Sequence, residues 1–162
     1  MLLQIALGTI FMMLTVLVSA FAFWFLEVIL IRARPWLARP PHRPKLMAVL
    51  CIAVLWSFST VTAGVWIWAI AFYALGIFVT VEGAVYFSLV AYTTLGFGDI
   101  LLPQDWRLLA GMASANGLLN FGLLTAMLVE VLRFVRLEQI ETSVEEREVQ
   151  RRARGFFLGD RR

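Results

Sequence analysis

Three stretches of the chain carry no charged side chain: residues 5–26, 46–81 and 108–129. About 20 mostly apolar residues are enough for a helix to cross the hydrocarbon core of a bilayer. The first and third stretches have 22 residues each, so each fits one spanning helix. The middle stretch has 36 residues and would form a helix of roughly 54 Å, too long for one crossing. We therefore expect it to cross once and then turn, with Gly76 as the break.

The turn is followed by a short apolar segment and then by a polar one. Thr80, with Glu82 two positions later, is typical of a helix N-cap with an acidic residue in the first turn. The pattern predicts a helix of about 12 residues over EGAVYFSLVAYT, which ends at the segment YTTLGFGDI, residues 92–100.

Composition agrees with the apolar pattern. The chain has 162 residues, of which 61% are apolar and 15% charged, and its mean hydropathy is +0.84. These values are typical of an all-α protein of the membrane. The chain has one cysteine, Cys51, and one histidine, His42, and no set of a nucleophile and a base, so the sequence excludes a metalloenzyme and offers no support for any other enzyme.

The charged residues between the apolar stretches predict the orientation. The first connecting segment has only basic residues, namely Arg32, Arg34, Arg39, Arg43 and Lys45. Short basic segments stay in the cytoplasm, so the net charge of +3 reports topology and not binding of nucleic acid. The second connecting segment is mostly acidic and is expected outside. We thus expect a multi-pass protein of the plasma (inner) membrane with an external N-terminus and a cytoplasmic C-terminus.

The first apolar stretch has an alternative interpretation. Ala20-Phe21-Ala22 has the small-residue pattern of a signal-peptide cleavage site. Cleavage there would place the basic segment outside, against the positive-inside rule, and no basic residue precedes the stretch. A retained helix is the simpler interpretation.

The glycine-rich segment can hold cations. Non-helical backbone at membrane depth must be enclosed by protein or line a watery cavity. Gly96 and Gly98 alternate with larger residues, and glycine reaches positive φ at little cost, so successive carbonyls can point to one side. A ring of such carbonyls from several chains replaces the water around a monovalent cation, and the Thr94 hydroxyl adds another oxygen layer.

Residues 93–99, T-T-L-G-F-G-D, resemble the filter signature T-T-V-G-Y-G-D of potassium channels. The resemblance implies K+ bound at Thr94, Leu95, Gly96 and Phe97, with Gly98 completing the filter. It assigns support of the filter to Thr93, Asp99, Tyr86, Phe87, Val90 and Tyr92. Leu95 and Phe97 replace valine and tyrosine, and both are expected to pack behind the filter. Val90 stands where some bacterial members have an acidic residue, so we expect the brace that this residue gives to Asp99 to be absent.

The third apolar stretch resembles the inner helix of the same family over residues 117–126. Gly117 and Gly122 are candidates for a gating hinge or for close helix packing, and Thr125 is a further gate candidate. Glu130 is expected either to join a carboxylate ring at the inner mouth or to pair with Arg133 or Arg136. Glu27 is expected to have an interfacial role.

These patterns together predict a domain organisation with four parts. These are an N-terminal transmembrane helix (1–31), a basic cytoplasmic loop (32–45), a pore domain (46–136) and a charged cytoplasmic tail (137–162). The resemblance covers residues 46–134 and implies a homotetramer with a re-entrant pore helix. The tail is either a short helical bundle spaced by Leu137, Ile140 and Val144 or a solvated or lipid-facing helix, with Glu148 placed to pair with Arg151 or Arg152.

The expected function is passive, selective conduction of K+, with the lipid bilayer as surroundings and no small-molecule ligand identifiable. Two alternatives stay open: a weakly selective cation channel, and a non-conducting membrane scaffold that binds a partner through its tail. A transporter subunit is disfavoured, because such chains resemble four fused pore repeats and this chain has one.

Overall fold

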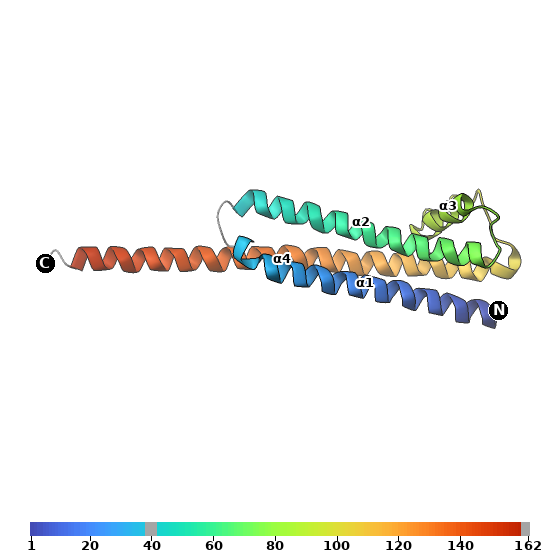
Figure 1. Ribbon diagram of the computed structural model, residues 1–162, viewed down its shortest axis with the longest axis horizontal. Coiled ribbons are helices and arrows are strands. Elements are labelled where there is room, and N and C mark those ends of the chain that lie inside the picture. The colour runs from blue at the N-terminus through green and yellow to red at the C-terminus, as the bar shows by residue number, and fades with distance from the viewer. Residues whose placement is uncertain (38–41, 160–162) are drawn as a thin grey trace.

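The computed structural model describes residues 1–37 and 42–159, without the side chains of residues 42, 43, 138, 139 and 141–159. Its elements are α1 (Leu2–Leu37), α2 (His42–Ala74), α3 (Val81–Tyr92), a 3-10 turn η1 (Gln104–Trp106) and α4 (Arg107–Gly159). The three long helices lie alongside one another, with α1 and α4 running in one direction and α2 in the other (Figure 1). The prediction of an all-helical fold is confirmed for the described part of the chain.

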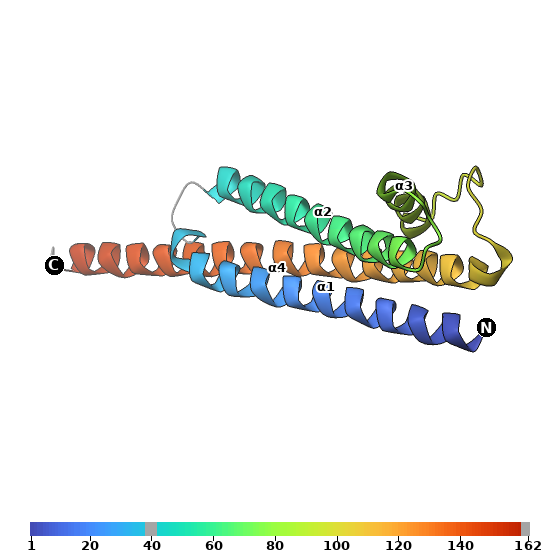
Figure 2. The ribbon, with the colours of Figure 1, turned by 45° about the vertical axis from the view of Figure 1, so that its right-hand side comes forward.

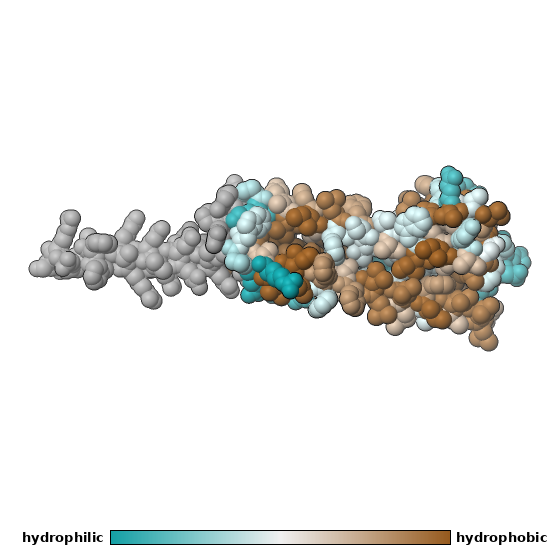
Figure 3. All heavy atoms as spheres, viewed as in Figure 1, coloured by the Kyte–Doolittle hydropathy of each residue, from teal (hydrophilic) through white to brown (hydrophobic). Residues whose placement is uncertain are grey.

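Three helical segments are long and apolar enough to cross a membrane: Leu2–Leu37, Pro44–Ala74 and Gln104–Leu137. Many of their large apolar side chains are exposed on the outside of the bundle. Figure 3 shows apolar residues along the body of the bundle and hydrophilic residues gathered towards its two ends. The chain is therefore a multi-pass membrane protein.

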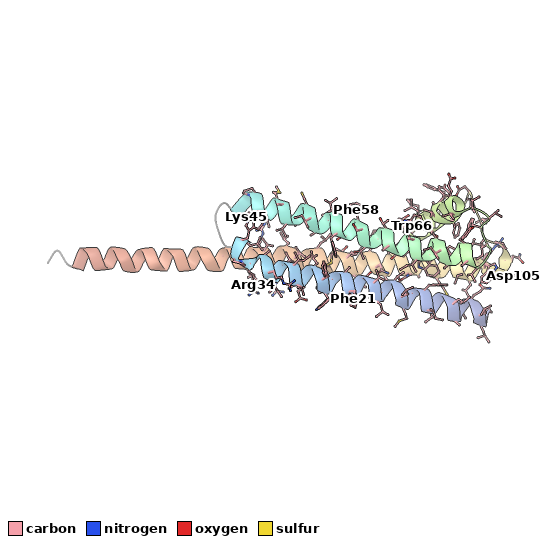
Figure 4. All side chains as sticks on the ribbon, in the orientation of Figure 1. Phe21, Arg34, Lys45, Phe58, Trp66 and Asp105 are labelled. Atoms are coloured by element: carbon pink, nitrogen blue, oxygen red, sulfur yellow. The ribbon has the colours of Figure 1, made fainter. Side chains whose placement is uncertain are left out.

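The charged segments lie at opposite ends of the helices. Figure 4 shows Arg34 and Lys45 at the end where α1 finishes and α2 begins, and Asp105 at the opposite end. Figure 2 shows α3, together with the loop that follows it, at the same end as Asp105. Thus the basic and acidic segments that the sequence assigns to the two sides of the membrane are separated by the length of the bundle.

The helices meet in two apolar clusters. One joins α1, α2 and α4 near the basic end and consists of Leu26, Leu30, Leu37, Val49, Ala53, Leu124, Met127, Val131 and Val135. The other joins α2, α3, α4 and the loop before α4, and consists of Val65, Trp68, Phe72, Phe87, Ala91, Tyr92, Leu102, Leu109 and Ala113. The second cluster holds the short helix α3 in place against the two long helices.

The basic segment differs from the expected loop over residues 32–45. Helix α1 continues through Pro35 to Leu37, and α2 already begins at His42. Leu37 is fully buried in the first cluster, so apolar packing stabilises the last turn of α1 despite its proline. Pro44 lies in the first turn of α2, where the missing N–H costs no helical hydrogen bond.

The turn after α2 has the geometry predicted from the sequence. Gly76 has φ +70°, and its amide donates to the Tyr73 carbonyl at 3.0 Å. Thr80 has extended backbone, and its hydroxyl oxygen accepts a hydrogen bond from the Gly83 amide at 3.2 Å. The predicted break at Gly76 and the predicted N-cap at Thr80 are both confirmed.

Helix α4 is one continuous element of 53 residues, about 80 Å long at the usual rise per residue. It therefore includes the predicted inner helix and continues through the tail to Gly159. The predicted pairing of Glu148 with Arg151 or Arg152, and the role of Val144 in apolar spacing, lie outside the described side chains.

Candidate functional site

The segment that resembles a filter directly follows α3 and has an alternating backbone. Thr94, Gly96 and Gly98 have φ of +59°, +57° and +75°. The two glycines confirm the expectation of positive φ. Among the described residues, Thr94 is the only one other than glycine with positive φ. A β-branched residue is strained there, at a cost of about 1–2 kcal/mol, and such strain is concentrated at functional sites.

The amide groups at the start of this segment point back to α3. Leu95 N–H donates to the Val90 carbonyl at 3.0 Å, Gly96 N–H to the same carbonyl at 3.3 Å, and Thr94 N–H to the Ala91 carbonyl at 3.0 Å. In a trans peptide the carbonyl points opposite to the amide of the next residue. The carbonyls of Thr93, Thr94 and Leu95 therefore point away from α3.

The apolar side chains of the segment are not covered by their own chain. Leu95 is 58% exposed and Phe97 is 66% exposed. Their own chain leaves both side chains uncovered, because α3 faces the amide side of the segment. The expectation that both pack behind the filter concerns an assembly of several copies and stays a prediction.

The far end of the segment is tied to α3 by one side-chain bond. The Tyr86 hydroxyl donates to the Asp99 carboxylate at 2.6 Å. This bond lowers the pKa of Asp99 and raises that of Tyr86, because it favours a charged carboxylate and a neutral phenol. Val90 gives Asp99 no acidic side-chain brace, as expected from its residue type, but Tyr86 ties Asp99 to α3 instead, and Val90 serves the segment through its backbone carbonyl.

Two more predicted support residues anchor α3. Phe87 packs edge-on against Phe72 of α2, with ring centroids 5.4 Å apart and planes at 80°. Tyr92 is buried, and its hydroxyl lies so close to Gly64 of α2 that a Cβ there would overlap it. Aromatic packing against α2 thus fixes the end of α3 from which the filter-like segment starts.

Gly117 brings α4 directly onto the same end of α3. A Cβ built on Gly117 would overlap the backbone carbonyl of Tyr92. Gly117 therefore has the close-packing role that the sequence left open beside a hinge. A Cβ at Gly122 would meet nothing within 4 Å, and α4 stays helical through it, so a hinge at Gly122 stays a prediction.

One face of α4 is exposed on the surface of the single chain. Leu118, Phe121, Thr125 and Val129 are exposed at helical spacing, and the Thr125 hydroxyl donates to the Phe121 carbonyl of its own helix at 2.8 Å. We name these four residues the α4 stripe.

Glu130 points away from the α4 stripe. It follows Val129 and is therefore rotated by about 100° around the helix. Its carboxylate lies 4.0 Å from Arg133. It also lines a cavity of about 270 Å³ between α1 and α4, together with Glu27 and Arg34. This geometry favours the pairing with Arg133 over a carboxylate ring.

The protein is thus an all-helical membrane protein with one loop of unusual backbone. It has three long apolar helices and a short helix that ends at a strained, glycine-rich segment. A family model described as "Ion channel" matches residues 46–134, which is more than half of the chain. The chain therefore belongs to this ion channel family, whose two-transmembrane domain is of the potassium-channel type, and the family is not a class of enzymes. The predicted resemblance over residues 46–134 is confirmed. Comparison with curated proteins and with solved structures gave no match.

Proposed function

We propose that the protein is a potassium-selective channel that conducts K+ passively through the axis of a homotetramer in the plasma membrane. In this proposal K+ binds to the carbonyl oxygens of Thr94, Leu95, Gly96 and Phe97, and the Thr94 hydroxyl adds one more oxygen. Gly98 completes the filter. Carbonyl oxygens in rings of this kind replace the hydration shell of the ion.

The observation that carries the proposal is the direction of the peptide groups. The amides of Thr94, Leu95 and Gly96 are occupied by the carbonyls of Val90 and Ala91. The carbonyls of the same three peptide groups, which belong to Thr93, Thr94 and Leu95, therefore point away from α3. An ion on that side of these peptide groups would meet oxygens and no amide protons. The positive φ of Thr94, Gly96 and Gly98 gives the backbone the alternation that such a row requires.

The short helix α3 fits the role of a re-entrant pore helix. Its 12 residues give a length of about 18 Å, which reaches only partway through a hydrocarbon core of about 30 Å. The C-terminal end of a helix carries partial negative charge, and in α3 this end adjoins the filter. In the proposal it favours a cation at the pore axis.

The exposed parts of the chain support an assembly of several copies. Leu95 and Phe97 are uncovered, and so is the non-helical backbone around them, which lipid cannot solvate. The α4 stripe is also uncovered and lies on the same helix as Gly117, which contacts α3. A ring of copies would enclose the filter and place the α4 stripe of each copy around one axis. The family resemblance implies four copies.

The arrangement of charges supports the orientation. Arg34 and Lys45 lie towards the end of the bundle from which α4 extends, which in this proposal is cytoplasmic (Figures 1 and 4). Arg133 lies next to Phe134, whose ring is under the Arg34 guanidinium. The end with Asp99 and Asp105 would then be external, as would the N-terminus.

The test is flux into proteoliposomes that contain the full chain. We expect K+ flux to exceed Na+ flux, and Gly96→Ala to abolish it, since φ of +57° strains alanine although no atom blocks its Cβ. Gly111→Ala is the matched control, because its Cβ meets nothing within 4 Å and it lies in regular helix. Unchanged K+ flux in Gly96→Ala would contradict the proposal.

The same measurements separate the alternatives. Equal K+ and Na+ flux would identify a weakly selective cation channel. No flux, together with a monomer or dimer in detergent with and without K+, would identify a scaffold.

A further inference from the structure

Four buried polar side chains form a continuous ladder of hydrogen bonds between α1 and α4. The Ser19 hydroxyl donates to Asn120 Oδ1 at 2.5 Å, and Asn120 Nδ2 donates to Asn116 Oδ1 at 3.0 Å. Asn116 Nδ2 then donates to Thr15 Oγ1 at 2.6 Å, and the Thr15 hydroxyl donates to the Met12 carbonyl at 2.8 Å. Each donor meets an acceptor, and the ladder ends on a backbone carbonyl.

The ladder lies in an apolar region, where its bonds have no substitute. Asn116 is completely buried, and Thr15, Ser19 and Asn120 are nearly so. Within a bilayer no water replaces a lost hydrogen-bond partner, so an amide or hydroxyl that loses its partner would make no hydrogen bond at all. The ladder therefore specifies one position of α1 along α4.

Two other contacts hold α1 at the same position. The Gln4 side-chain amide donates to the backbone carbonyl of Asp105, just before α4 begins. At the basic end the Arg34 guanidinium lies over the Phe134 ring, 5.0 Å from its centre. Helix α1 is thus attached to α4 or its leading turn at both ends and in the middle.

The residue next to the ladder contacts the end of α3. Gly117 follows Asn116 and lies against the Tyr92 carbonyl, one residue after Ala91, which holds the Thr94 amide. A single turn of α4 therefore touches α1 on one side and the start of the filter-like segment on the other. A shift of this turn away from Tyr92 changes the support of the Thr94 amide and thereby the position from which the filter-like segment starts.

We propose that Asn116 is a positioning residue through which α1, by its Thr15 hydroxyl, sets how closely α4 packs against the C-terminal end of α3 and thereby sets the ion selectivity of the filter. The inference rests on the proposed function. Since α1 lies outside the matched residues 46–134, it is an addition of this chain to the channel domain.

The test is the ratio of K+ to Na+ flux in Thr15→Val proteoliposomes. Valine keeps the shape of threonine but leaves the Asn116 amide without its acceptor. We expect the ratio to fall by about threefold to tenfold, the range that one hydrogen bond within a membrane is worth. Thr15→Ser, which keeps the hydroxyl, should retain the wild-type ratio.

Thr9→Val is the matched control. The Thr9 hydroxyl donates only to the Ile5 carbonyl of its own helix at 2.8 Å and is exposed. Its replacement should leave the ratio unchanged, whereas a general effect of losing a hydroxyl from α1 would change it as much as Thr15→Val does.

A second variant distinguishes positioning from folding. Asn116→Leu should lower the ratio at least as much as Thr15→Val does, because it also removes the Asn116 Oδ1 acceptor of Asn120. The double variant should be no worse than Asn116→Leu alone, because the bond to Thr15 is already lost in that variant. An unchanged ratio in Thr15→Val, or loss of the assembled protein in that variant, would overturn the inference. A wild-type protein that does not prefer K+ would instead refute the proposed function itself.

Discussion

Tyr86 donates a 2.6 Å hydrogen bond to Asp99, so a residue in the second turn of α3 holds the residue that ends the filter-like segment. The beginning of the segment is held by the bonds of Thr94, Leu95 and Gly96 to the last turn of α3. The strained backbone between them is thus attached to one helix at both ends.

Replacement of Tyr86 by phenylalanine should shorten the time for which the channel conducts. The variant keeps the ring and removes the hydroxyl that holds Asp99. We expect nearly wild-type initial K+ flux, since the amide bonds at the start of the filter remain, followed by a severalfold faster decay. Flux from proteoliposomes over time measures both quantities.

Tyr73→Phe is the control for this experiment. Tyr73 is an exposed tyrosine of α2 outside the filter region, so its hydroxyl should not affect the decay. An equal decay in Tyr86→Phe and wild type would show that the bond to Asp99 does not stabilise the filter.

The same bond should depend, at both extremes, on the pH of the solution that bathes Asp99. The pKa of Asp99 is lowered from 3.8, so its contribution is present above pH 3.8 and is lost as pH falls through the lowered value. The pKa of Tyr86 is raised from 10.0, so its contribution is present below pH 10.0 and is lost as pH rises through the raised value. The difference in flux decay between wild type and Tyr86→Phe should be constant between these values and disappear beyond them. A difference that changes near neutral pH would contradict this assignment.

Gly117→Ala should prevent assembly of the channel. Its methyl group would overlap the Tyr92 carbonyl, which is backbone and cannot rotate away, so α4 and α3 would have to separate. Size-exclusion chromatography in detergent with K+ should show loss of the oligomer. Gly111→Ala, on the same helix with nothing near its Cβ, should assemble normally and be more stable by about 0.5–1 kcal/mol. Normal assembly of Gly117→Ala would mean that α4 and α3 are far enough apart at Gly117 to leave room for a methyl group.

Thr80→Ala should destabilise α3. The variant removes the acceptor of the Gly83 amide, and loss of an N-cap costs about 1 kcal/mol. Thermal unfolding of the reconstituted protein should show a lower midpoint for Thr80→Ala and a midpoint close to wild type for Thr80→Ser, which keeps the hydroxyl. Equal midpoints for the alanine and serine variants would exclude a capping role.

Features that depend on neighbours in the sequence were predictable. The break at Gly76 and the cap at Thr80 each follow from one residue type at one place, and both are present in the structure. The family region at 46–134 was likewise recognisable, because T-T-L-G-F-G-D is a contiguous signature.

Features that depend on packing were not predictable in the same way. The last turns of α1 are helical because Leu37 is buried against residues far away in the sequence, which a basic, proline-containing segment does not indicate. The ladder between Thr15 and Asn116 joins residues 101 positions apart. Its signal in the sequence is a matching spacing: Asn116 and Asn120 lie four residues apart in one uncharged stretch, and Thr15 and Ser19 lie four residues apart in another.

The bond from Tyr86 to Asp99 was missed for another reason. The family resemblance points to a carboxylate at position 90 as the brace of Asp99, whereas an exposed tyrosine four residues earlier performs a similar task from a different turn of α3. The positive φ of Thr94 was missed because residue type alone predicts this conformation for glycine and not for a β-branched residue.

The continuity of α4 has a mechanical consequence. Between Gly122 and Gly155 the sequence contains neither glycine nor proline, so about 50 Å of this helix form a stiff rod. The rod extends past the ends of α1 and α2 (Figure 1). A movement of its far end would therefore reach Gly122, which lies within two turns of the Gly117 contact, without being absorbed by bending.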